Sequence, residues 1–254
     1  LDEDTRAAIQ SIQKPIKLEI LVSLSCTMCP ELVTAAQRIA AENPGVTAEV
    51  YDLNHFADLR ERYKVMSVPC LVVNGGEQVS FDPIVAAGPN GSRPHAVPGD
   101  QVVDVGMFIT MDFGCKVEGY CSDMTRTFYF KTVSDAHREV YETTKASNET
   151  AISKIRPGVP LYQLDAAARD LISAKGWGPN FNHRLGHFIG LSEHEFGDVS
   201  SANTWEAKPG MIFSIEPGIY LTGDTGVRVE DLVLVTEDGV EVLNHYPKEL
   251  QIIE

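Results

Sequence analysis

Alternating apolar and polar positions predict a small α/β unit in the first part of the chain. Residues 17–24 (KLEILVSL) alternate in polarity and are rich in β-branched side chains, which is typical of a strand. Residues 30–42 place apolar side chains on one helical face, and the sequence NPG that follows stops a helix. Two further strands are predicted over 46–53 and 68–73, with a short helix over 56–63.

After residue 80 the pattern changes, because two polar turns are each enclosed by apolar runs. Such a pattern predicts two β-hairpins. Between the hairpins, apolar side chains at helical spacing predict two helices, the first with Ser134 as its N-cap and the second stopped by Gly176. The predicted elements are a hairpin with arms 105–111 and 128–130, helices to about 155 and over 161–175, and a hairpin with arms 211–220 and 227–236.

The first hairpin carries two aspartates at its turn. The midpoint between Asp112 and Asp123 falls between Val117 and Glu118, so a regular hairpin would place the two carboxylates opposite one another. Like charges directly opposite on paired strands are destabilising. A shared proton, an arginine or a metal ion could offset the repulsion. The alternative is a solvated turn flanked by two ordinary aspartates.

The second hairpin repeats this arrangement with glutamates. The midpoint between Glu216 and Glu230 is Gly223, again inside the turn. Between the two hairpins lie three histidines beside Gly186 and Gly190, where small residues allow close approach of backbone or ligand. Four carboxylates and one imidazole suit two divalent cations with a bridging hydroxide. The alternative is that each histidine is a surface or core residue.

A CxxC sequence marks the junction of the first predicted strand and helix. Cys26 lies at the end of that strand, where the helix dipole favours a thiolate, and Cys29 follows one turn later, where it could resolve a mixed disulfide. Half a zinc site and two buried thiols are the alternatives, but no second CxxC or histidine pair lies nearby. Pro69, just before a predicted buried strand, fits a cis-proline packed against such a dithiol.

Composition narrows the class of protein. The chain has 254 residues, of which 43% are hydrophobic and 22% charged, with a net charge of -15. This acidity argues against a nucleic-acid partner, which requires clustered lysine and arginine. No run is long enough for a membrane helix, and no leader pattern precedes the first strand. Five cysteines form a poor disulfide framework, so we expect a reducing, cytoplasmic setting.

Residues 1–80 resemble a known redox module. The segments VSLSCTMCPELV and VMSVPCLVVNG are similar to the CxxC-bearing N-terminal module of the alkyl hydroperoxide reductase flavoprotein subunit, which has a thioredoxin- or glutaredoxin-like fold. The resemblance implies that Cys26 is the attacking thiol, Cys29 the resolving thiol and Pro69 a cis-proline, with a disulfide-exchange partner protein. That fold should close with a strand, for which residues 78–81 are available, and a helix, which the sequence does not predict.

Residues 81–254 closely resemble the M24 metallopeptidases of the pita-bread, or creatinase-like, fold. The segments that match are FDPIVAAGPNGSRPH, MDFGCKVEGYCSDMTRTF, HRLGHFIGLSEHE, IEPGIY and VRVEDLVLVTEDG. The resemblance implies two divalent metal ions, manganese before cobalt, zinc or iron. Their implied ligands are Asp112, Asp123, His187, Glu216 and Glu230.

The same resemblance implies a reaction and further site residues. VRVED favours an Xaa-Pro aminopeptidase or dipeptidase, which would act on short proline-containing peptides and which we expect to be a homo-oligomer, most simply a dimer. Glu216 is then the best acceptor for a proton of water. His95, His183 and His194 match histidines that handle substrate and intermediate, and Arg228 matches the arginine of the Xaa-Pro branch.

The sequence departs from both resembled families at the junction of the two parts, residues 1–80 and 81–254. The predicted α+β fold is a pita-bread domain without its first helix pair, preceded by an incomplete thioredoxin-like module, and the two meet near residues 80 and 81. A natural fusion, an engineered chimera and a composite chain are the three explanations. We expect the sheet face left bare to be covered by the N-terminal module or another subunit. Two other functions stay open: a redox module attached to an inactive peptidase-like domain, and a non-catalytic binding protein.

Overall fold

The structure, a computed structural model, describes residues 6, 9–26, 29–63, 65, 68–74, 81, 83–97 and 102–253. The chain divides into two compact units. The first comprises residues 1–79 with 115–119, and the second comprises 80–114 with 120–254. Most of the strand predicted over 78–81 lies outside the described residues.

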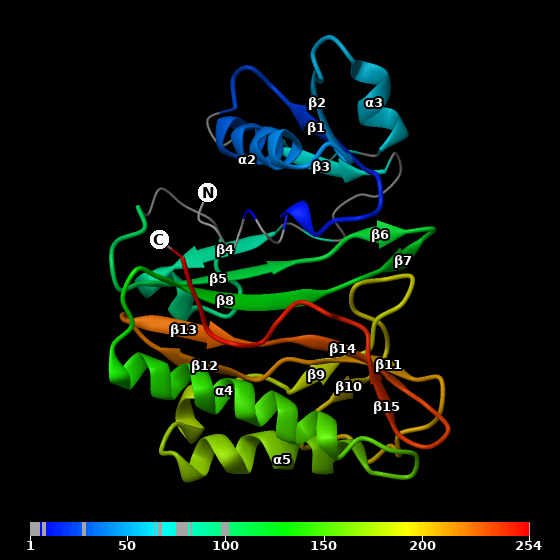
Figure 1. The fold of residues 1–254 in the computed structure, drawn as a ribbon. Coiled ribbons are helices and arrows are strands. Elements are labelled where there is room, and N and C mark those ends of the chain that lie inside the picture. The colour runs from blue at the N-terminus through cyan, green and yellow to red at the C-terminus, as the bar shows by residue number, and fades with distance from the viewer. Residues whose placement is uncertain are drawn as a thin grey trace. The chain divides into compact units, whose positions relative to one another are not determined.

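The first unit is a three-stranded sheet in the order β2-β1-β3 (Figure 1). β1 pairs in parallel with β2 and antiparallel with β3, and α2 forms the crossover between the parallel strands. Its elements are β1 (Ile16–Val22), α2 (Cys29–Glu42), β2 (Val46–Asp52), α3 (Ala57–Arg62) and β3 (Cys70–Val73). These bounds confirm the elements predicted for this part of the chain to within two residues.

Both faces of the central strand β1 are buried. Leu18 and Ile20 point to one face, where they join a cluster that contains Ala36 of α2, whereas Leu21 points to the other face and joins Leu59 of α3. Burial on both faces explains why the alternation of polarity ends at Glu19 and residues 20–22 are all apolar. A strand covered on both sides buries alternate residues in opposite directions.

The second unit contains the remaining elements. They are β4 (Ile84–Ala87), η1 (Gly88–Ser92), β5 (Phe108–Phe113), β6 (Lys116–Val117), β7 (Tyr120–Cys121), β8 (Met124–Phe130), α4 (Asp135–Ser153), α5 (Leu161–Ala174), η2 (Gly178–Asn180), β9 (Gly186–His187), β10 (Asp198–Val199), β11 (Ile212–Ile215), β12 (Gly218–Leu221), β13 (Thr225–Arg228), β14 (Asp231–Val235), β15 (Val240–Val242) and β16 (Gln251–Ile253). The β6 strand falls in the segment grouped with the first unit.

Three layers make up the second unit (Figure 1). The sheet β16-β8-β5-β4 faces the strands β11 to β14, and helices α4 and α5 cover the other side of those strands. The main hydrophobic core lies between the helices and the strands, with residues such as Ile152, Leu164 and Phe213 buried in it. The two strand layers meet at polar side chains, which leaves room for a site between them.

The register of the first hairpin corrects the sequence prediction. Asp112 pairs with Thr125 instead of facing Asp123, because the turn is centred on Glu118 and Gly119. Both turn residues have positive φ, at 49° and 93°, the conformation of a two-residue type I′ turn. Asp123 therefore lies diagonal to Asp112 on the same face of the ladder, where side chains still reach one another but repel less.

The register of the second hairpin confirms its prediction. Ile215 pairs with Asp231 and Gly218 pairs with Arg228. Glu216 and Glu230 therefore occupy opposite positions in the short gap between the two ladders. Gly223 lies in the connecting turn with φ of 79°, a conformation that favours glycine.

The helix ends also follow the sequence signals. The Ser134 side chain accepts a hydrogen bond from the backbone N–H of His137 and so caps α4, as predicted. Gly176 follows α5 with φ of 90°, which confirms it as the residue that ends the helix. Residues 88–92, which follow β4, form the 3-10 helix η1. A Cβ atom on Gly226 of β13 would lie 1.9 Å from the backbone oxygen of Gly91 in that helix, so Gly226 could not carry a side chain without movement.

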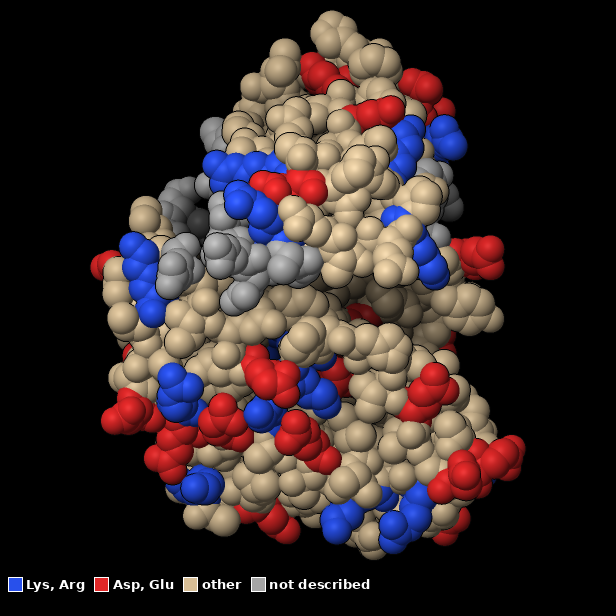
Figure 2. Space-filling view, in the orientation of Figure 1, with Lys and Arg blue, Asp and Glu red and all other residues tan. Residues whose placement is uncertain are grey.

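No helix pair precedes β5 among the described residues of the second unit. On the outer face of the β16-β8-β5-β4 sheet, Val85 and Phe113 are each 43% exposed. Coverage of this face by another part of the chain or another subunit stays a prediction. No described helix is long and apolar enough to cross a membrane. Over the second unit, the face in Figure 2 shows acidic and basic side chains interspersed, with no continuous basic patch.

Candidate metal centre

A cavity of about 340 Å³ opens between the two strand layers of the second unit. It gathers residues from β5, from position 123 just before β8, from the β9 region and from the second hairpin, which are far apart in the sequence. All nine residues that the sequence predicted for the metal and catalytic sites line it. These are His95, Asp112, Asp123, His183, His187, His194, Glu216, Arg228 and Glu230.

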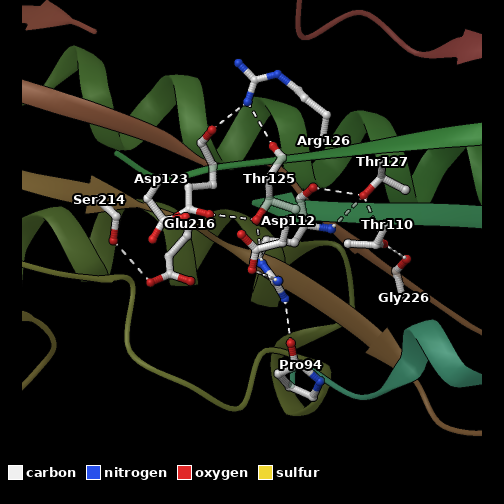
Figure 3. Close-up of polar contacts among 12 residues, drawn as sticks. Pro94, Thr110, Asp112, Asp123, Thr125, Arg126, Thr127, Ser214, Glu216 and Gly226 are labelled. Carbon is white, nitrogen blue, oxygen red and sulfur yellow. Dashed lines mark hydrogen bonds and ion pairs between the residues drawn. The ribbon is translucent and has the colours of Figure 1, made fainter. Parts of the chain in front are cut away.

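Three of the predicted ligands form a compact group. One ligand atom each from Asp123, His187 and Glu230 lie within 4.8 Å of one another, and all three side chains are buried. The Nε2 atom of His187 lies 3.5 Å from Asp123 Oδ2 and 3.6 Å from Glu216 Oε1. Figure 3 shows the carboxyl groups of Asp112, Asp123 and Glu216 directed toward one another. This donor set of carboxylates and one imidazole is a possible site for divalent cations.

Two carboxylate oxygens at this site have no hydrogen-bond partner among the described residues. They are the buried atoms Asp112 Oδ1 and Asp123 Oδ1. Burial, and then the negative charge of Asp112, raise the pKa of Asp123 to about 9, and burial also raises the pKa of Glu230 and Glu216. Bound cations would pair with these oxygens and favour the ionised carboxylates. The residues present therefore fit divalent metal ions.

His187 is positioned by a close approach of two strands. A Cβ atom on Gly186 would lie 1.8 Å from the backbone oxygen of Ser214, so only glycine allows β9 to lie this close to β11. The backbone N–H of His187 donates to Ser214 Oγ at 3.0 Å. Its Nδ1 lies 3.1 Å from the Phe188 carbonyl oxygen, so Nδ1 carries the proton and Nε2 is left as the acceptor that faces the carboxylates.

Each guanidinium nitrogen of Arg228 donates a hydrogen bond to another group of the protein. It is only 4% exposed, and its Nη2 donates to Asp112 Oδ2 at 2.6 Å. Nε donates to Thr125 Oγ1 at 3.0 Å, and the Thr125 hydroxyl donates in turn to Glu230 Oε2 at 2.6 Å. Nη1 donates to the Pro94 carbonyl oxygen at 2.9 Å (Figure 3). The guanidinium thus links and orients carboxylates from both hairpins.

His183 is held by both of its ring nitrogens. Nδ1 lies 2.7 Å from the Arg184 carbonyl oxygen, and Nε2 lies 3.0 Å from the Tyr220 hydroxyl. Burial lowers the pKa of His183 to about 4, with a smaller effect from the charge of Arg228, so the ring is neutral at pH 7. The tautomer with the proton on Nδ1 fits this geometry, and Tyr220 then donates to Nε2 while it accepts from Arg228 Nη1 at 3.0 Å.

Sequence reasoning missed four residues around the cavity. Tyr220 and Thr125 hold His183, Arg228 and Glu230, whereas Arg184 and Glu193 line the cavity wall. Only their positions beside named histidines or at the end of a hairpin strand could have indicated them. Of the predicted residues, His95 is exposed at the cavity, and the ring of His194 lies 4.2 Å from that of His187.

The predicted redox residues lie in the first unit. Cys26 and Cys29 form a disulfide with a Cα–Cα distance of 5.5 Å, and Cys29 is the first residue of α2. The backbone N–H of Cys29 donates to Cys26 Sγ at 3.1 Å. The Val68–Pro69 peptide bond is cis, as the sequence predicts. These local features agree with the resemblance, whereas the thioredoxin-like assignment of residues 1–80 stays a prediction.

Comparison with known proteins places the chain in a family. The model of metallopeptidase family M24 matches residues 25–237, so this chain belongs to that family. Over 174 residues it is 47% identical to an uncharacterized peptidase of Staphylococcus aureus strain MRSA252, an alignment that covers 68% of this chain and 50% of the relative. The chain therefore spans about half the length of the curated relatives that it matches.

Solved structures agree with this assignment. The Xaa-Pro dipeptidase from Bacillus anthracis is 41% identical, with a TM-score of 0.68 over 69% of this chain and 50% of its own. The recombinant prolidase from Thermococcus sibiricus is 29% identical, with a TM-score of 0.69 over 99% of this chain and 76% of its own. The α+β, pita-bread fold predicted from the sequence is thereby confirmed.

Proposed function

We propose that this chain is a metal-dependent exopeptidase that hydrolyses the bond before proline in short Xaa-Pro peptides. Asp112, Asp123, His187, Glu216 and Glu230 would hold two divalent cations, manganese first and cobalt, zinc or iron as alternatives. The names of the similar solved structures, an Xaa-Pro dipeptidase and a prolidase, support the substrate class. A cytoplasmic location and a dimeric state stay part of this proposal.

One observation carries the proposal. Two carboxylate pairs from separate hairpins and one imidazole converge in a single cavity, with two buried carboxylate oxygens that have no hydrogen-bond partner among the described residues. Burying several ionised carboxylates together is costly unless cations offset the charge. A metal site accounts for this cluster, whereas a purely structural role would leave the cost of burying the charges without compensation.

The chain's own residues suggest a division of roles. Bound divalent cations would supply an acidified water and a polarised carbonyl. Glu216, whose Oε1 accepts from Ser214 Oγ at 3.1 Å, is placed to accept the proton of that water. His194 and His95 line the cavity, where their rings would contact the intermediate and the leaving proline nitrogen. His183 offers mainly its ring surface, and Arg228 fixes Asp112.

Hydrolysis of alanyl-proline by the metal-loaded protein is the direct test. We expect release of proline with added Mn²⁺ and its loss after chelation with EDTA, because the carboxylates alone provide no electrophile. Chromatography of the products and metal analysis of the same sample measure both. Readdition of Mn²⁺ should restore the activity, and hydrolysis that persists in metal-free protein would contradict the proposal.

A second candidate function rests on the first unit. The Cys26–Cys29 disulfide lies at the N-terminal end of α2, with Cys26 partly exposed and Cys29 only 4% exposed. We propose that Cys26 is the attacking thiol of a dithiol pair. Its thiolate would attack a substrate disulfide and release one substrate thiol, and Cys29 would then attack Cys26 and release the other. Two electrons from a dithiol such as dithiothreitol would return the pair to its reduced form.

Replacing Cys26 with serine should abolish dithiothreitol-driven reduction of insulin disulfides, with a loss of at least about tenfold. Serine cannot form the mixed disulfide, whereas Cys115→Ser, outside the CxxC, should leave the rate unchanged. Turbidity of the released insulin chains follows the reaction. A wild-type rate no faster than dithiothreitol alone would remove the redox function without affecting the peptidase proposal.

A further inference from the structure

The chain segment that follows β15 contacts the backbone beside two of the predicted metal ligands. Residues 244–248, which we call the C-terminal strap, connect β15 to β16. None of the described residues that line the cavity belongs to the strap, so any effect it has on the site must pass through the ligands. Its contacts go to the strands that carry Asp123 and Glu230. The strap is therefore a candidate for positioning these two ligands.

One side chain of the strap joins the two hairpins. Asn244 Nδ2 donates to the backbone oxygen of Asp123 at 3.0 Å. Its Oδ1 accepts from the backbone N–H of Leu232, two residues after Glu230. Asp123 and Glu230 are two of the three residues whose ligand atoms lie within 4.8 Å of one another. Because one short side chain is bonded to both strands, it fixes the distance between the backbones that carry these carboxylates.

An ion network around buried Asp231 holds the strap on the same strands. Arg126, only 3% exposed, donates from Nη2 to the Tyr246 carbonyl oxygen at 2.9 Å and to Asp231 Oδ1 at 2.7 Å. Its Nη1 donates to the backbone oxygen of Glu230. Lys248 Nζ lies 2.6 Å from Asp231 Oδ2. Replacing a buried ion network with apolar side chains is often neutral or stabilising, so a role in fixing geometry accounts for this network better than a gain in stability.

Support of the backbone matters at a metal centre because the ligand atoms must be placed accurately. Distances between a metal ion and its ligand atoms vary by only about 0.2 Å in a well-formed site. Asp123 Oδ1 has no hydrogen-bond partner among the described residues, so the position of this carboxylate depends strongly on its backbone. Removal of a group that orients metal ligands typically weakens metal binding by about 10- to 100-fold.

We propose that Asn244 is a positioning residue of the metal centre, which sets the separation of Asp123 and Glu230 and thereby the affinity for divalent cations. This inference rests on the proposed function, because it takes these two residues as metal ligands. It gives a role at the site to a segment that does not line the cavity.

Titration of metal-free protein with Mn²⁺ in a calorimeter tests the role of Asn244. We expect Asn244→Ala to raise the dissociation constant for Mn²⁺ about 10-fold, the lower end of the range for groups that orient ligands. Asn244→Leu keeps the volume of the side chain but cannot form the hydrogen bonds. It should have the same effect, and it replaces the alanine variant if that variant does not fold. Circular dichroism and melting of the metal-free proteins establish folding.

The matched control is Asn43→Ala in the first unit. The Asn43 side chain makes the same kinds of backbone contact, since its Nδ2 donates to the carbonyl oxygens of Ile9 and Ile12 and its Oδ1 accepts from the N–H of Gly45. Its loss should lower the melting temperature but leave the affinity for Mn²⁺ unchanged, because all five predicted metal ligands lie in the second unit.

Two outcomes would overturn the role of Asn244. One is wild-type affinity for Mn²⁺ in a folded Asn244 variant, and the other is an equal loss of affinity in Asn43→Ala, which would indicate general destabilisation. Hydrolysis of alanyl-proline by the same samples separates this inference from the peptidase proposal. If Mn²⁺ binding depends on Asn244 but wild-type protein hydrolyses nothing, only the peptidase function is contradicted. If wild-type protein hydrolyses the dipeptide and Asn244→Ala binds Mn²⁺ equally well, only the inference is contradicted.

Discussion

Replacing Glu216 with glutamine is expected to reduce hydrolysis of alanyl-proline to near the detection limit. Glutamine keeps the shape and the contact with Ser214 but removes the negative charge beside His187 Nε2, at 3.6 Å. The amide cannot accept a proton from water, and loss of a general base alone lowers kcat by about 10²- to 10⁴-fold. A weakened metal site would lower it further. Steady-state kinetics and metal analysis of the same preparation measure both effects.

The charge-matched control for this variant is Glu237→Gln. Glu237 is an exposed residue in the turn between β14 and β15, so its neutralisation should change neither activity nor metal content. Circular dichroism and thermal melting should show that both variants fold. If Glu216→Gln retained wild-type kcat with a full complement of metal, Glu216 would be neither proton acceptor nor essential ligand, and the proposed division of roles would be wrong.

Local signals were sufficient for most of the elements. The N-cap Ser134 and the stop at Gly176 set the ends of α4 and α5, because capping depends only on neighbours in sequence. The alternation of the strands likewise follows from burial of one or both faces. Predictions of this kind succeed where the physical cause lies within a few residues of the pattern.

The two hairpins show where the sequence was less informative. Gly223 marks the centre of the second turn in the sequence, and the predicted position of Glu216 opposite Glu230 is confirmed. The first turn is centred on Glu118 and Gly119, and Glu-Gly is a weaker type I′ signal than Asn-Gly or Asp-Gly. A shift of one residue in the centre moves the partner of Asp112 by two positions, from Asp123 to Thr125.

The support behind the ligands could not be predicted from any local pattern. Thr125 bonds to Arg228 and Glu230, residues more than 100 positions later, because β8 packs against β13 and β14. Tyr220 meets His183 from a different strand in the same way. Sequence can suggest ligands by residue type, whereas the groups that orient them depend on which strands lie together. The contact by which Arg228 orients Asp112 depends on this packing as well.

Replacing Gly186 with alanine is expected to have the largest effect on folding. The added Cβ would lie 1.8 Å from the Ser214 backbone oxygen, and neither β9 nor β11 can move away cheaply, because Phe213 and Ile215 on β11 are fully buried. We expect a loss on the order of 3 kcal/mol in the free energy of unfolding, which corresponds to a melting temperature roughly 6–12 °C lower. Metal affinity should fall as well, since His187 follows directly.

Gly239→Ala is the control, because its Cβ would meet nothing closer than 3.9 Å and its φ is not positive. Its stability should be unchanged or slightly higher, since alanine reduces the freedom of the unfolded chain. Melting curves with and without Mn²⁺ distinguish a loss of packing between β9 and β11 from a weakened metal site at His187. If the gap between Gly186→Ala and wild type widens with Mn²⁺, the displaced imidazole weakens the metal site in addition to the packing. A wild-type melting temperature for Gly186→Ala would show that β9 and β11 are not held this closely in solution.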